Sequence, residues 1–278
     1  MSETQSSTPI AVTIAGSDSS GGAGIQADLK TFSALGVYGA SVITALTAQN
    51  TLGVSAIHDV PPAFISQQME AVFSDLAVRA VKIGMLSRPQ TIAAVAEGLT
   101  QFGAQRIVLD PVMVAASGAR LLEDAAIESL KTRLLPLADL VTPNLPEAAA
   151  LLDAPVAEDE TGMRAQGERL LALGAKAVLM KGGHGSGAES VDLLVTEGGI
   201  SRLPAVRHAT RNTHGTGCTL SSAIAAGLAK GLDLNTAVTA GKRYITGAIA
   251  AADQLQIGQG HGPVHHFHAL WPAAAART

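Results

Sequence analysis

The sequence contains little cysteine, few aromatic residues and little charge. Of its 278 residues, one is cysteine, 3% are aromatic and 15% are charged, and the formal net charge is −4. A single thiol excludes an internal disulfide and suits a reducing compartment, which favours the cytoplasm. Because the chain has no basic stripe or arginine-rich tail, we expect no nucleic acid partner. These features favour a soluble, intracellular, globular protein.

The sequence also lacks membrane-spanning and targeting patterns. No run of about 18 apolar residues occurs, so we expect no membrane partner. The first residues, MSETQSSTP, are polar and precede no apolar region of the kind that a signal peptide needs. We therefore expect residues 1–8 to be a disordered leader. Residues 9–278 should form a single domain, because no linker-like stretch divides them.

Short apolar runs alternate with amphipathic segments along the chain. The run IAVTIAG at 10–16 is followed by apolar residues at helical spacing from Ile25. Repeated strand–helix units predict an α/β protein with a mainly parallel sheet and helices on both faces. The predicted strands are 10–16, 41–50, 80–86, 106–113, 139–144 and 177–183. Besides the first, the predicted helices are about 62–76, 88–102, 123–135, 146–153, 161–173, 216–230 and 234–254. Two short strands around EGG in 191–205 predict a hairpin at the edge of the sheet.

The segment THGTGC at 213–218 places the only cysteine directly behind a glycine-rich turn. A helix that starts near Thr216 would offer unpaired N–H groups and a positive dipole end to an anion such as phosphate. Gly215 and Gly217 would let the backbone approach that anion closely, although an ordinary helix cap has the same composition. The helix start should lower the pKa of the Cys218 thiol, which would favour a base or a nucleophile. The alternative is a small buried apolar residue.

Polar residues follow several predicted strands, at the edge where parallel sheets bind ligands. Asn144 and Glu147 could face a hydrated Mg²⁺ ion, or they could form a capping box at a helix start. Asp110 is a second candidate for the metal and phosphate region. Lys181 could neutralise nucleotide phosphates, or it could simply mark the exit of a strand into solvent.

Two further polar residues are candidates for ligand recognition. Asp28, one turn into the first helix, and Gln49, at the end of the second strand, could read an aminopyrimidine edge by paired hydrogen bonds. Alternatively, Asp28 only complements the helix dipole and Gln49 is an ordinary loop residue. His265, His266 and His268 have no adjacent acid or thiolate, so we expect them to pack and not to bind a metal.

Taken in order, these segments resemble the hydroxymethylpyrimidine/phosphomethylpyrimidine kinases of thiamine biosynthesis, in the ribokinase-like superfamily. The matching segments are TIAGSDSSGGAGIQADLKTFSALGVYGASVITALTAQNTLGV, KIGML, VLDPVM, LVTPNLPEAAALL, VLMKGGH, NTHGTGCTLSSAIAAGLAKG and GPVHHFH. The likeness covers about residues 9–271. It implies a three-layer α/β/α fold with a central, mainly parallel sheet and a small edge hairpin, and it suggests a homodimer.

The resemblance implies ATP- and Mg²⁺-dependent phosphorylation of 4-amino-5-hydroxymethyl-2-methylpyrimidine and then of its monophosphate. Cys218 would stand where most ribokinase-like enzymes have a catalytic aspartate. The anion hole would comprise Gly215, Thr216, Gly217 and Cys218. The pyrimidine would contact Gly16, Asp28, Gln49, Met85 and Val112. The Mg·ATP side would comprise Asp110, Asn144, Lys181, Thr213 and Glu147, with Glu147 acting on the metal through water and Asp110 lying near it.

The chain departs from the family pattern at two positions. Ser19 stands where the family often has proline, which should slightly loosen the loop 17–24 that closes over the substrate. Cys218 in place of aspartate leaves the base open. A pyridoxal or pyridoxine kinase and a pyrimidine-binding sensor without turnover remain alternatives. A cysteine-nucleophile hydrolase is disfavoured, because no His–Asp pair is evident beside Cys218 and His214 is interpreted as part of the turn.

Overall fold

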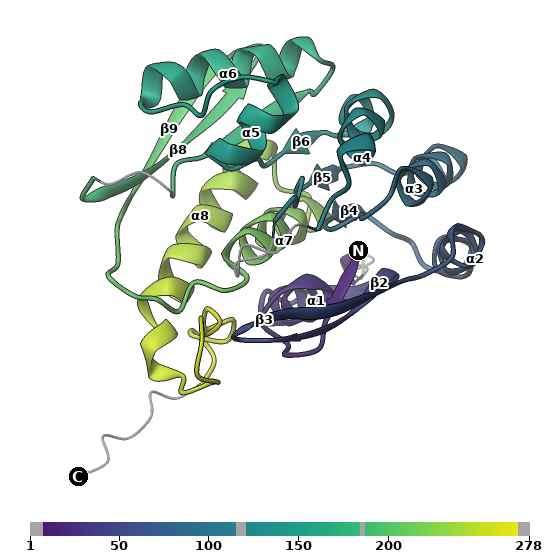
Figure 1. The fold of residues 1–278 in the computed structure, drawn as a ribbon, viewed down its shortest axis with the longest axis horizontal. Helices are drawn as coiled ribbons and strands as arrows, with labels where there is room; N and C mark the ends of the chain where they lie inside the picture. Colours follow the sequence, from purple (N-terminus) through teal and green to yellow (C-terminus); the bar gives the residue numbers. More distant parts are fainter. Residues whose placement is uncertain (1–7, 115–120, 184–186, 272–278) are drawn as a thin grey trace, which may run out of the picture.

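A computed structural model describes residues 8–114, 121–183 and 187–271 (Figure 1). Within these ranges the strands form one nine-stranded sheet in the order β3-β2-β1-β4-β5-β6-β7-β8-β9. The strands are β1 (Ile10–Asp18), β2 (Tyr38–Asn50), β3 (Gly53–Asp59), β4 (Ala80–Ile83), β5 (Ile107–Leu109), β6 (Leu140–Val141), β7 (Ala177–Lys181), β8 (Glu189–Thr196) and β9 (Gly199–Val206). Residues 1–7 of the predicted leader lie outside the described residues.

The sheet is parallel from β2 to β7 and antiparallel at its two ends. β8 and β9 form the predicted edge hairpin. The strand order reverses at β1, which has β2 on one side and β4 on the other. Ligands of such sheets bind where the order reverses, outside the carboxyl ends of the strands. The topology thus predicts a ligand site beside the segments that follow β1 and β4.

Helices cover both faces of the sheet, as Figure 1 shows. One face carries α1 (Gly24–Ala34), α7 (Thr216–Ala229) and α8 (Leu234–Ala250), and the other carries α2 (Pro62–Phe73), α3 (Pro89–Gln101), α4 (Asp124–Ser129), α5 (Leu145–Leu152) and α6 (Glu160–Ala172). Each face has its own apolar core: Phe32, Ile224 and Ile245 belong to the first, and Met69 and Leu151 to the second. The predicted three-layer α/β/α architecture is confirmed.

Several element boundaries differ from the prediction. Strands β5 and β6 are much shorter than 106–113 and 139–144, because Pro111 and Pro143 follow them and lack the N–H that a ladder needs. The helix predicted over 123–135 is α4 followed by a π turn, Leu130–Leu134, and a 3₁₀ turn. The helix predicted over 234–254 ends at Ala250, before a 3₁₀ turn.

Strand β3 was not predicted. It pairs antiparallel with β2 and forms the end of the sheet opposite the β8–β9 hairpin. Most of its side chains, including Ile57, are exposed, so the strand lacks the buried apolar face on which the sequence prediction relied. No helix in the described part of the chain is both long enough and apolar enough to cross a bilayer.

Candidate active site

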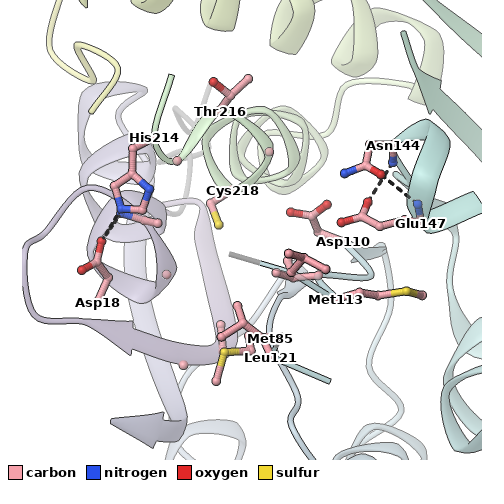
Figure 2. A pocket seen from close by; sticks show the side chains of 18 of the residues that line it. Asp18, Met85, Asp110, Met113, Leu121, Asn144, Glu147, His214, Thr216 and Cys218 are labelled. Carbon is pink, nitrogen blue, oxygen red and sulfur yellow. Dashed lines mark hydrogen bonds and ion pairs between the residues drawn. The ribbon is translucent and has the colours of Figure 1, made fainter. Parts of the chain in front are cut away.

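A cavity of about 580 Å³ lies at the carboxyl edge of the sheet, against the start of α7 (Figure 2). Its lining comes from segments that are far apart in the sequence but follow neighbouring strands. Most of the predicted site residues line it: Gly16, Gln49, Met85, Val112, Asp110, Asn144, Glu147, Lys181, Thr213, Gly215, Thr216, Gly217 and Cys218. Because parallel strands end at the same edge of a sheet, residues up to about 200 positions apart in the sequence meet in this cavity.

Asp28 is the exception, because it does not line the cavity. Its side chain is fully buried below α7, where it forms an ion pair of 2.9 Å with Lys82 and accepts hydrogen bonds from Thr13 and Ser222. A carboxylate bound to these partners inside the core cannot also form hydrogen bonds to the edge of a ring in the cavity. The predicted direct contact of Asp28 with the pyrimidine is thus wrong, because the sequence placed the residue near the right edge but could not show that it points into the core.

Lys82 is a buried cation that the sequence analysis overlooked. Its ammonium is inaccessible to solvent, and a Cβ added to Gly84 would come within 2.7 Å of it, so the glycine leaves room for the charge. Burial lowers the pKa of Lys82, but Asp28, Cys218 and Asp110 more than offset this and hold it above its usual value. A lysine within the apolar run AVKIGM was the signal that could have identified it.

The turn before α7 requires glycine at Gly215. Its φ is +81°, and a Cβ there would lie 1.9 Å from the carbonyl oxygen of Gly22, which leaves no room for a side chain. Helix α7 begins at Thr216, as predicted, and the first N–H groups of a helix have no partner within it. Gly217 and Cys218, in that first turn, line the cavity, so this helix start faces the space where an anion would bind.

On the far side of the cavity a lysine lies between two carboxylates. The Lys181 ammonium is 2.8 Å from Asp110 and 3.7 Å from Glu147. Burial raises the pKa of Asp110, but Lys181 and Lys82 outweigh it, so the net shift is downward and Asp110 is charged at neutral pH. Burial and the charge of Asp110 raise the pKa of Glu147 to about 7 despite Lys181. A Cβ at Gly217 would lie 3.3 Å from the Lys181 ammonium, so this pair adjoins the start of α7.

Asn144 and Glu147 form the capping box that was one of their two predicted roles. The Asn144 side chain accepts from the Glu147 N–H at 2.8 Å, and the Glu147 carboxylate accepts from the Asn144 N–H at 2.8 Å (Figure 2). Both residues also line the cavity. The box leaves further lone pairs on each oxygen, so capping does not exclude a water-mediated role in holding a metal.

The Cys218 environment contradicts the expected fall in its pKa. Burial raises the pKa of the thiol to about 11, and the charge of Lys82 and a hydrogen bond from the Gly24 N–H offset this only in part. The side chain is partly exposed to the cavity but has protein on its other sides, including the carboxylates of Asp28 and Asp110. At neutral pH this residue is therefore a neutral thiol.

A His–Asp pair closes the opposite side of the cavity. His214 Nε2 lies 2.8 Å from Asp18 Oδ2, and both side chains are buried (Figure 2). Asp18, the last residue of β1, also accepts hydrogen bonds from the backbone of Ser20, Gly22 and Ala23, so it holds the loop 19–23 between β1 and α1 in a defined shape. Burial raises the pKa of Asp18, but the bonds from His214 and Ser20 bring it well below its usual value. The 196-residue separation left no local signal for this pair.

The histidines near the C-terminus pack, as expected. His265 and His266 are buried, and the His265 ring meets Trp271 edge-on with centroids 5.3 Å apart. Among the described residues no group of three or more His, Cys, Asp or Glu side chains is placed to hold a metal ion directly.

A family model described as phosphomethylpyrimidine kinase matches residues 18–265 of the chain. The chain belongs to this family. A relative from Rhizobium meliloti, named hydroxymethylpyrimidine/phosphomethylpyrimidine kinase, is 63% identical over 264 residues, which are 95% of this chain and 99% of the relative. These matches confirm the family resemblance described from the sequence.

Solved structures of two kinds share the fold. A phosphomethylpyrimidine kinase from Clostridium difficile is 50% identical, with a TM-score of 0.77 over 86% of this chain and 99% of that one. An ADP complex of Bacillus subtilis pyridoxal kinase is 35% identical, with a TM-score of 0.88 over 95% of this chain and 99% of that one. The fold is therefore common to phosphomethylpyrimidine kinases and pyridoxal kinases, so the fold alone does not identify the substrate.

Proposed function

We propose that the chain is a kinase that transfers the γ-phosphoryl group of ATP to 4-amino-5-hydroxymethyl-2-methylpyrimidine and then to its monophosphate, in thiamine biosynthesis. One observation carries the proposal: a single cavity has a helix start at its centre, a lysine between two carboxylates on one side, and Gln49 and Met85 on the other. Phosphoryl transfer needs positioning and charge stabilisation, and this arrangement supplies both.

We assign the ATP side to Asp110, Asn144, Glu147, Lys181 and Thr213. The Lys181 ammonium would neutralise phosphate charge, for which its fixed position beside Asp110 prepares it. Mg²⁺ would supply a charge that draws the phosphate oxygens together. The absence of a direct ligand cluster within the described residues suits this ion, which keeps several waters and is held by few protein oxygens, here Glu147 through water and Asp110 nearby.

The start of α7 would stabilise the charge on the transferred group. Gly217 and Cys218, in the first turn of α7, line the cavity, and their backbone N–H groups would bind the transferred group with the positive end of the helix dipole behind them. A thiol with a pKa of about 11 does not serve as a base at neutral pH, and a loose transition state requires little help from one. Cys218→Ala should therefore lower kcat by less than about tenfold; a loss of a hundredfold or more would reinstate the thiol as the base.

The ring side would consist of Gly16, Gln49, Met85 and Val112, which line the cavity between β1, β2 and the segments after β4 and β5. The Gln49 amide has a donor and an acceptor side by side, which match the amino group and the adjacent ring nitrogen of an aminopyrimidine. A pyridoxal kinase remains the second candidate, because the Bacillus subtilis structure of that name matches the fold over nearly the whole chain.

An ADP-release assay with Mg·ATP would test the proposal. Hydroxymethylpyrimidine, its monophosphate and pyridoxal would be offered in parallel. Turnover of both pyrimidines is the expected result. Turnover of pyridoxal alone would replace the proposal with a vitamin B6 kinase, and tight ring binding without any turnover would point to a sensor.

We also propose a cytoplasmic homodimer. The cytoplasm suits a chain whose only cysteine is unpaired in the structure. For the dimer, the hairpin of β8 and β9 exposes Val206, and β2 and β3 expose Leu46, Ile57 and the intervening Leu52. Large apolar side chains of this kind commonly mark interfaces. Light scattering coupled to gel filtration would give the mass, and a 28 kDa particle at all concentrations would refute the dimer.

A further inference from the structure

Strand β1 ends at Asp18, whose partner in the parallel ladder is Thr47 of β2. Two residues further along β2, the backbone of Gln49 is paired by a side chain. The hydroxyl of Ser19 accepts a hydrogen bond from the Gln49 N–H at 2.8 Å and donates one to the Gln49 carbonyl at 2.7 Å. One hydroxyl thus makes both bonds that a strand residue would have made. The loop is tied to β2 at this point, where a looser loop was expected.

We call the two hydrogen bonds between Ser19 and Gln49 the clamp. They lie where the pairing of β2 with its other neighbour, β3, is irregular. The antiparallel register with β3 shifts between Ala48 and Gln49, so two residues of β3 oppose one step of β2. Beyond the bulge Gln49 still pairs with Val54 and Asn50 with Gly53, but the bulge makes this end of the β2–β3 ladder less regular than the rest. In this part of the chain, the two bonds from Ser19 hold the backbone of Gln49 in register with the end of β1.

The Gln49 side chain depends on that register. Its amide oxygen is 3.1 Å from the Thr47 hydroxyl, and its amide nitrogen is 3.5 Å from His214 Nε2, on the wall of the cavity. Thr47 belongs to β2 itself, so the only one of these partners outside the strand is the His214 ring, which is held by its bond to Asp18 through the same Nε2. The amide keeps its place beside that ring only while the backbone of Gln49 stays in register. A shift of the backbone would carry the amide away from a bound ring.

We propose that Ser19 is a positioning residue for ring recognition, which acts through the backbone of Gln49 and does not itself contact the ring. The proposal rests on the function proposed above, in which Gln49 binds the pyrimidine. It makes Ser19 a determinant of affinity for the ring and not of phosphoryl transfer, because the ATP side and the start of α7 have no contact with it among the described interactions.

Steady-state kinetics on the full chain would test the role. Ser19→Ala should raise the KM for hydroxymethylpyrimidine about fivefold, the effect of about one net hydrogen bond, and leave kcat and the KM for ATP within twofold. Ser19→Thr keeps the hydroxyl and should restore the parent KM. Ser55→Ala is the matched control. The Ser55 hydroxyl on β3 also donates to a carbonyl of β2, that of Ala48, but it does not bond to Gln49. It should leave all three constants unchanged.

Amide exchange gives a readout that does not depend on activity. In ¹⁵N-labelled protein, the Gln49 N–H should exchange several-fold faster in Ser19→Ala than in the parent and in Ser55→Ala, because it loses its acceptor. Faster exchange with a raised pyrimidine KM supports the proposal. Faster exchange in Ser19→Ala with an unchanged KM for the pyrimidine overturns the positioning role. An equal fall in kcat in Ser19→Ala and Ser55→Ala also overturns it. If the parent turns over neither pyrimidine, the proposed function fails; equal Gln49 exchange in parent and variant would separately refute the clamp.

Discussion

Because Cys218 is the only cysteine, alkylation of the native protein reports on one thiol. Burial raises the pKa of this thiol to about 11, although the charge of Lys82 acts in the opposite direction. At pH 8 such a thiol is about 0.1% thiolate, whereas a free thiol with a pKa of about 8.5 is roughly one quarter thiolate. Since the thiolate is the reactive form, iodoacetamide should react with the folded protein about 200-fold more slowly than with glutathione at this pH.

The assay measures the second-order alkylation rate from pH 6 to 11 by intact-mass spectrometry. The rate should still be rising at pH 10, and the same chain in urea should titrate near the ordinary thiol value. The urea sample controls for the reagent, and the partial exposure of the side chain to the cavity gives the reagent access. An apparent pKa at or below about 8.5 in the folded protein would refute the reasoning and would mean that the start of α7 dominates the environment of the thiol.

The raised pKa of Cys218 also makes the free energy of unfolding depend on pH. The folded pKa lies above that of a free thiol, so on raising the pH the unfolded chain loses this proton first. The contribution of Cys218 to stability is therefore intact below about pH 9 and is lost progressively up to about pH 11. Urea denaturation should show a steeper loss of stability in this window for the parent than for Cys218→Ala.

Three further predictions concern other parts of the site. Lys82→Met should lower the free energy of unfolding by about 3–5 kcal/mol, measured by urea denaturation, because it strands the buried charge of Asp28; an effect below about 1 kcal/mol would count against the buried pair. Glu147 has a folded pKa of about 7, so as the pH rises from 4.5 to 7 the parent should lose stability relative to Glu147→Gln. Parallel pH profiles of the melting temperature for the two proteins would contradict the raised pKa. Gly215→Ala should abolish turnover and lower the melting temperature, since its Cβ would collide with the Gly22 carbonyl, and a fully active, equally stable variant would show that the turn can open.

The sequence was sufficient for the architecture where the signals are local. Alternation of buried strands and amphipathic helices predicted the parallel sheet, because a parallel strand is apolar on both faces and needs a helical crossover. The edge strand β3 escaped prediction for the converse reason: its side chains are mostly exposed, so burial imposed no pattern on them. Prolines after β5 and β6 carried the information about the strand ends, but the apolar runs outweighed them in the prediction.

The candidate site divides in the same way. Residues at the ends of parallel strands, such as Asp110 and Lys181, were found from the sequence because the geometry of the sheet brings those ends together whatever the detailed packing. The direction in which a side chain points was not available at that level. Asp28 and Gln49 were placed near the same edge, yet the first turns into the core and the second lines the cavity.

By itself, then, the sequence determined the layered fold, the edge of the sheet that forms the site and polar residues at the strand ends such as Asp110 and Lys181, since these follow from periodicity and chain order. Only the tertiary structure decided the pairing of Asp18 with His214 and of Asp28 with Lys82, and the protonation of Cys218. Electrostatic energies depend on distance and burial and not on separation along the chain. A helix start alone would lower the pKa of the thiol, but the protein and the carboxylates packed around it raise it.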